Sequence, residues 1–247
     1  TGDFAGVSDT VRYQGIAKLT VNMGMVAYTI HELNSAIAKA DAGNVDNDSG
    51  APHNWDEGWA FFHGPDEDYG CSPAKVMEKR AADFGTETNG VSNALTASQT
   101  AMVDGLAALQ AEDSAGYTAA ADTVVKNLVI TYSQAVLKYT SKMNSTDSAA
   151  KYQVEGYAFW KAIEAYSAAY TNACIDTEGN VTYVGDSNAT ACDAGETFDG
   201  HYGADKINEI LNLQDATQLG TSYDVTAHLE HVWAHYGITS DDIGSYS

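Results

Sequence analysis

Basic residues are scarce in this sequence. Its 247 residues include 12 Lys and Arg against 34 Asp and Glu, which gives a formal net charge of −22 at pH 7. Such a charge repels nucleic acids and anionic lipid surfaces, so we expect no nucleic-acid partner. The charge also attracts metal cations, although solubility alone would explain it, because a large net charge keeps chains apart.

Long apolar runs are missing too. No stretch of about 18 apolar residues is present, so we expect no membrane insertion. The first residues lack an initiator Met and an apolar leader, as in a secreted chain whose signal peptide has been removed or in a chain that has been trimmed. Four N-x-S/T sequons fall in loop-like stretches where a glycan can be attached, which favours a secreted glycoprotein. They begin at Asn47, Asn144, Asn180 and Asn188.

Cysteine is limited to three residues. Cys174 and Cys192 bracket a polar segment that can bury little apolar surface, and we predict that they form a disulfide worth about 3 kcal/mol. Cys71 is then left over, and it is free, pairs with a removed segment, or replaces one of the other two. The absence of a Cys-x-x-Cys pair disfavours a zinc site.

Strand-like alternation is almost absent, and apolar residues recur instead at three- and four-residue steps, which is typical of helices. The segment from Asp9 to about Lys39 contains no proline and is predicted to be one long helix. A second helix is expected from about Asn54 until Gly64 and Pro65 stop it. Further helices are predicted at 73–84, 95–111, 115–143, 148–173, 203–213 and 222–237. Residues 175–200 are interpreted as a loop.

An internal repeat organises these helices. The motif Glu57-Gly58-Trp59-Ala60-Phe61-Phe62 returns as Glu155-Gly156-Tyr157-Ala158-Phe159-Trp160, each time after a long helix and a polar loop. We therefore predict an all-α fold, an up-and-down helical bundle made from two pseudo-symmetric helical repeats and a C-terminal closing helix. The repeats span about 9–111 and 113–213, the closing helix spans 222–237, and all lie in one domain, 1–247.

The two motif glutamates are the first candidates for chemistry. Glycine costs about 1 kcal/mol in a helix relative to alanine, so its presence beside each glutamate indicates a close approach. For Glu57 the alternative is a capping box with Asn54. Glu155 should lie about two turns into its helix among aromatic residues, where a buried carboxylate has to be hydrogen-bonded, paired or metal-bound.

Histidines supply the remaining candidates. His228, His231 and His235 lie three and four residues apart on one flank of the last long helix, next to an apolar stripe. Imidazole nitrogens there can bind iron, zinc or copper, and a solvated helix edge is the alternative. His31, in the first long helix, and Asp56, beside the first motif, complete the predicted metal ligands.

Fifteen tyrosines form a large supply of phenols. Tyr28, Tyr132 and Tyr236 recur at a spacing of 104 residues, and we expect them to be core hydrogen-bonders. Signatures of catalysis are missing, including Gly-x-Ser-x-Gly, a phosphate-binding loop and His-Glu-x-x-His, so no enzyme is predicted.

Both copies of the motif, together with the opening Val11-Arg12-Tyr13-Gln14-Gly15, resemble the algal iron-assimilation family of low-iron-inducible or high-CO2-inducible periplasmic proteins. The resemblance extends from the N-terminus to about Tyr236. It implies a secreted protein of the periplasmic, or cell-wall, space that helps to concentrate iron for uptake.

The working hypothesis is a non-enzymatic iron-binding protein. Glu57 and Glu155 would meet across the pseudo-symmetry axis, and His231, His235 and His31 would supply nitrogen to ferric or ferrous iron, with an anion as a candidate co-ligand. A cell-surface iron transporter or ferroxidase would receive the iron. The alternatives are a metal-free structural protein of the wall and a metal-dependent hydrolase or oxidase.

Overall fold

The computed structural model describes residues 2–65 and 72–247. Its chain divides into two compact units. Unit 1 comprises Thr1–Leu19 and Tyr132–Ser240, and unit 2 comprises Thr20–Thr131 and Asp241–Ser247. The proposed single domain over 1–247 stays a prediction.

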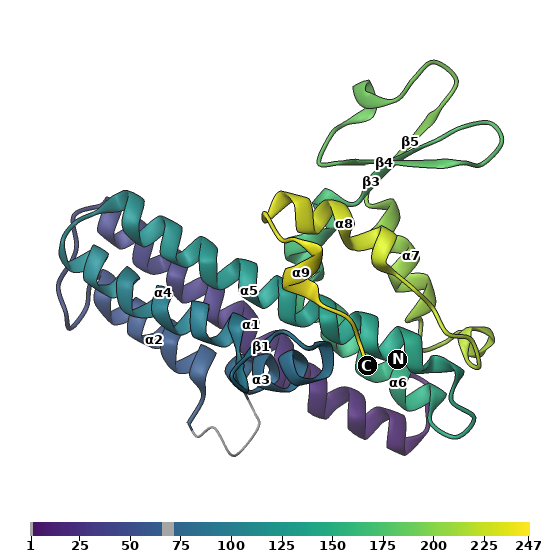
Figure 1. The fold of residues 1–247 in the computed structure, drawn as a ribbon, viewed down its shortest axis with the longest axis horizontal. Helices are drawn as coiled ribbons and strands as arrows, with labels where there is room; N and C mark the ends of the chain where they lie inside the picture. Colours follow the sequence, from purple (N-terminus) through teal and green to yellow (C-terminus); the bar gives the residue numbers. More distant parts are fainter. Residues whose placement is uncertain (1, 66–71) are drawn as a thin grey trace. The chain divides into compact units, whose positions relative to one another are not determined.

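Helices dominate the described residues, as the sequence predicts (Figure 1). They are α1 (Asp9–Asp41), α2 (Ala51–His63), α3 (Pro73–Phe84), α4 (Asn93–Gln110), α5 (Ser114–Ser141), α6 (Ala149–Ser167), α7 (Tyr202–Ile210), α8 (Thr226–His235) and α9 (Ser240–Ile243). The long helices α1 and α5, and the motif helices α2 and α6, follow the predicted order. The pseudo-symmetric superposition of the two halves remains a prediction.

Helix ends are best predicted where the local chemistry is strong. The predicted helix 73–84 is confirmed at both ends because Ser72 Oγ accepts a hydrogen bond from the Lys75 amide, Pro73 occupies the first turn, and Gly85 takes a left-handed conformation with φ of 69°. In α2 the predicted start is wrong. The helix begins at Ala51, directly after Gly50, which has no side chain to cap it.

The interpretation of residues 175–200 as a loop is wrong. A three-stranded antiparallel sheet in the order β4-β3-β5 is formed by β3 (Asn172–Ile175), β4 (Val181–Gly185) and β5 (Thr197–Asp199). A two-stranded hairpin, β1 (Glu87–Thr88) with β2 (Val91–Ser92), precedes α4. Strands of three to five residues are too short to show a clear alternation.

The disulfide between Cys174 and Cys192 is confirmed, with their Cα atoms 5.4 Å apart. It ties β3 to the segment that returns toward β5. Cys71 lies outside the described residues. The disulfide therefore stabilises a sheet that buries few large apolar side chains, as the sequence indicated.

Each unit has its own apolar core. In unit 2 the largest fully buried side chains include Trp55, Phe62, Leu33, Met77 and Leu109. In unit 1 they include Trp160, Tyr132, Met143, Ile163 and Leu211. The motif helices α2 and α6 each contribute a tryptophan to these cores, Trp55 and Trp160.

Candidate metal site

The first motif copy lies on α2, which packs closely against α1. A Cβ added at Gly58 would lie 3.3 Å from Leu33 Cδ2 and 3.4 Å from the carbonyl oxygen of Thr29. The glycine therefore permits the close approach that its position in a helix indicated. Asn54 also faces α1, inside the helix and not at its N-cap, so the capping-box alternative for Glu57 is wrong.

Glu57 pairs with a histidine one turn before it. His53 Nε2 lies 3.4 Å from Glu57 Oε1, and both side chains are 47% exposed. Glu57 is not buried, because the residues of α2 that face α1 and the core are its neighbours at 54, 55 and 58. An exposed carboxylate and an imidazole at this distance can be bridged by a metal ion.

A second histidine and carboxylate lie on α1. His31 Nε2 is 3.9 Å from Glu32 Oε1, and Asn54 Nδ2 donates a hydrogen bond of 2.6 Å to Glu32 Oε2. Glu32 is buried, whereas His31 is largely exposed. The Oδ1 atom of Asn54 is buried and accepts no hydrogen bond from the described residues. This carbonyl oxygen is therefore a buried acceptor without a hydrogen-bond donor among the described residues.

His53 and Glu32 stand beside predicted ligands in the sequence but are not among the predicted metal ligands. His53 precedes Glu57 by four residues, which places both on one helix face, and this spacing indicates the pair. Glu32 follows His31 directly in the first long helix. Asp56, by contrast, turns toward α4 and lines an apolar groove with Trp55 and Trp59.

The second motif copy is built differently. Glu155 on α6 is 6% exposed, which confirms its predicted burial. A Cβ at Gly156 would lie 2.8 Å from Leu211 Cδ2 and 3.4 Å from Tyr139 Cβ, so this glycine also serves close packing. Glu155 belongs to unit 1 and Glu57 to unit 2. Their predicted meeting stays a prediction.

A polar network anchors the second motif copy to α7. Trp160 Nε1 donates to Asn208 Oδ1 at 2.9 Å, and Asn208 Nδ2 donates to Glu164 Oε1 at 2.6 Å. Lys161 Nζ donates to Glu164 Oε2 at 2.6 Å. Every charge in this network has a partner of opposite sign or a hydrogen bond, which indicates a structural role.

The histidines of α8 pack against aromatic rings. His228 Nδ1 shares a hydrogen bond with the Tyr183 hydroxyl, and the ring centroid of His231 lies 5.9 Å from that of Tyr183. His235 stacks on Tyr170 with a centroid distance of 3.6 Å. The predicted flank therefore exists, with its rings in contact with strand β4 and with Tyr170. A metal role for His231 and His235 stays a prediction.

Electrostatics favours a neutral His228. Burial, assisted by Lys206 and opposed by Asp224, lowers the pKa of its imidazole. Burial raises the pKa of the Tyr183 phenol to about 12, so the phenol is protonated near neutral pH, and its O–H can donate the hydrogen bond when His228 Nδ1 carries no proton.

The three tyrosines at 104-residue spacing differ in environment. Tyr132 is fully buried, which raises its pKa, and Tyr236 Oη donates to the Tyr166 carbonyl at 2.8 Å. Tyr28 is 54% exposed and packs on Phe61 with a centroid distance of 5.0 Å. The expectation of a core hydrogen-bonder is therefore wrong for Tyr28.

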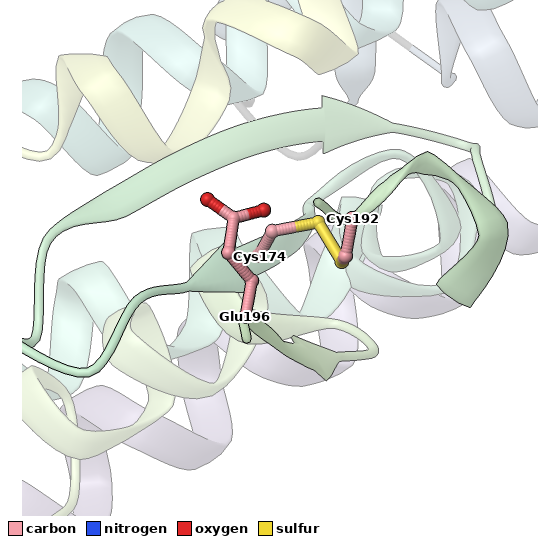
Figure 2. A group of neighbouring side chains, drawn as sticks. All are labelled: Cys174, Cys192 and Glu196. Carbon is pink, nitrogen blue, oxygen red and sulfur yellow. A yellow bond between two sulfur atoms is a disulfide. The ribbon is translucent and has the colours of Figure 1, made fainter. Parts of the chain in front are cut away.

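Figure 2 shows a different group of potential ligands, Cys174, Cys192 and Glu196. Among the described residues, these are the three His, Cys, Asp or Glu side chains whose ligand atoms lie close enough together to hold one metal ion. Both sulfurs are joined in the disulfide and lack the thiolate charge that metal binding needs. This group is therefore no metal site, and any iron ligands have to be sought elsewhere.

Comparison with known protein families decides the relationship. The sequence profile of a family described as low iron-inducible periplasmic protein matches residues 2–164. The chain belongs to this family. No curated protein and no solved structure gives a significant match.

Membership in the low iron-inducible periplasmic protein family confirms the resemblance and the periplasmic location. In residues 2–65 and 72–247, no helix combines the length and apolar character that crossing a bilayer requires. The matched residues include both motif copies and the pairs on α1 and α2, whereas α8 lies beyond the match. The pair His53 and Glu57 is thus the exposed candidate site that lies within the family region.

Proposed function

We propose that this protein binds iron in the periplasmic space and assists iron assimilation without catalysing a reaction. The observation that carries the proposal is the pair His53 and Glu57, 3.4 Å apart and half-exposed on the motif helix of a low-iron-inducible family. Carboxylate oxygen and imidazole nitrogen are ligands that suit iron.

Solvent would supply the rest of the ligand shell. In the described residues no third His, Asp or Glu group lies at ligand spacing with His53 and Glu57. Water, or an anion such as carbonate, would fill the remaining positions around the ion. With the −22 net charge, the protein also raises the local concentration of cations at its surface.

The role of the protein follows from the exposure of the pair. Ligands that stay half-exposed exchange their ion with solvent and with other proteins more readily than a closed cage does. Such a site suits an iron carrier that delivers its ion to a cell-surface transporter or ferroxidase.

The test measures iron binding to purified, tag-free protein by equilibrium dialysis with ferric and ferrous salts, followed by elemental analysis. Glu57→Gln should weaken binding at least tenfold, because it removes a charged ligand at constant shape. Glu78→Gln is the matched control, since Glu78 is a partly exposed α3 carboxylate of the same unit that pairs with Lys75.

Two results would contradict the proposal. If Glu57→Gln and Glu78→Gln bind iron equally well, the pair is no ligand and any iron lies elsewhere. If the wild-type protein binds neither form of iron, the protein is no iron binder. Unchanged far-UV circular dichroism in both variants ensures that folding does not cause the difference.

A further inference from the structure

An apolar groove of about 190 Å³ lies between α2 and α4 in unit 2. It is lined by Trp55, Asp56, Trp59, Met102, Val103 and Leu106. Trp55 and Met102 are buried and form the floor, whereas Val103 is 67% exposed at the edge. Val103 and the partly buried Trp59 leave apolar surface of the groove open to solvent.

The size of the groove selects the kind of occupant. Small-molecule pockets measure roughly 300–1,000 Å³, so this groove is too small for a typical ligand. A cavity of about 150 Å³ takes up benzene, so one branched or aromatic side chain fills the groove. Single anchors of this kind, set in a preformed pocket, are how protein partners dock.

The floor of the groove is preformed. Trp55 Nε1 donates a hydrogen bond of 2.8 Å to the Met102 carbonyl, which fixes the indole across the two helices. Gly105 lies against the same indole and leaves no space for a Cβ. Because the walls already hold their final positions, an occupant pays little ordering entropy on binding.

The charges around the groove indicate which charge an occupant should carry. Neither α2 nor α4 contains a lysine or arginine, and their acidic residues are Asp56, Glu57 and Asp104. Asp56 lines the groove, and Asp104 follows Val103 on the exposed side of α4. An apolar slot between two helices that carry only negative charge is complementary to an apolar side chain flanked by cations.

We propose that this groove docks a basic segment of a partner protein, with one leucine- or phenylalanine-sized anchor inserted over Trp55. Lysine or arginine residues of the partner lie beside Asp56 and Asp104. The single apolar anchor supplies affinity, and the flanking charges set its orientation. The inference is independent of iron binding.

The test uses a 14-residue amphipathic peptide of leucine and lysine as the probe, and its leucine–glutamate counterpart as a second peptide. Binding is followed by calorimetry and by the fluorescence of tryptophan, since Trp59 lies in the groove and is only partly buried. The leucine–lysine peptide should bind saturably with a blue shift, and the glutamate peptide should not bind.

Matched variants separate the groove from the general negative charge. Val103→Lys places a cation in the groove and should weaken peptide binding at least tenfold. Val91→Lys makes the same charge change at another exposed valine of unit 2, 53% exposed, and should weaken it less than twofold. Asp104→Asn should weaken binding two- to fivefold relative to Asp122→Asn, an exposed aspartate on α5.

Three outcomes would overturn the proposal. Equal binding to Val103→Lys and Val91→Lys would mean that only the net charge attracts the peptide. Equal binding of the glutamate peptide would remove the charge argument. A dimer in sedimentation experiments that Val103→Lys dissociates would assign the groove to a second copy of this chain.

Discussion

The glycine of the second motif gives the sharpest test of how the motif is built. Replacing Gly156 with alanine would add a Cβ only 2.8 Å from Leu211 Cδ2 and 3.4 Å from Tyr139 Cβ. Because Leu211 is fully buried, its methyl group has little space to retreat. Overpacking of this kind costs about 1–3 kcal/mol, whereas alanine gains about 1 kcal/mol in helix propensity. We expect a net loss of about 1 kcal/mol.

A control at Gly24 isolates the steric contribution. Gly24 lies inside α1, and an added Cβ would meet nothing within 4 Å. Gly24→Ala should therefore stabilise the protein by about 1 kcal/mol. In thermal unfolding followed by circular dichroism, the two variants should shift Tm in opposite directions by about 2–4 °C each.

A double-mutant cycle identifies the atom responsible. Leu211→Ala removes the methyl groups that the new Cβ would meet, so its cost should be smaller by about 1 kcal/mol in the Gly156→Ala background than in wild type. If Gly156→Ala stabilises the protein as much as Gly24→Ala does, the close-packing explanation of the motif glycine is refuted.

Two further predictions concern unit 1. Replacing Cys174 and Cys192 with serine should destabilise the protein by about 3 kcal/mol, measured as a lower midpoint of urea unfolding. Unchanged stability would show that the disulfide across these 18 residues does not stabilise the fold. The pKa of His228 is below its ordinary value of 6.5 in the folded protein, so its contribution to stability is complete above pH 6.5 and is lost as the pH falls through the folded pKa. His228→Asn should flatten the decline of Tm in that range, and an unaltered slope would contradict the pKa argument.

The sequence predicts the helices well because their periodicity and end signals are local. The ends of α3 follow from Ser72, Pro73 and Gly85, which act within one turn. The sheet at 172–199 could not be predicted this way, because its short strands depend on a disulfide and on tight turns. At one such turn, Asp176 accepts hydrogen bonds from the amides of Glu178 and Asn180.

The site was predicted only in part for a related reason. Glu57 and Glu155 occupy the same place in nearly identical motifs, yet one is half-exposed and the other is buried. The two motif helices pack against different neighbours. The preceding long helices differ in the same way, since Tyr28 is exposed and Tyr132, 104 residues later, is fully buried. Burial depends on tertiary packing, which a local motif does not encode. The partner His53, by contrast, was available from its four-residue spacing.

Iron in the crystal would test the central proposal most directly. Crystals of the wild-type protein soaked in a ferric or ferrous salt, with data collected on both sides of the iron absorption edge, should show an anomalous difference peak between His53 Nε2 and Glu57 Oε1. Crystals of Glu57→Gln should lack this peak. Anomalous density elsewhere, with none at this pair in the wild-type protein, would contradict the assignment of the iron site to the motif helix.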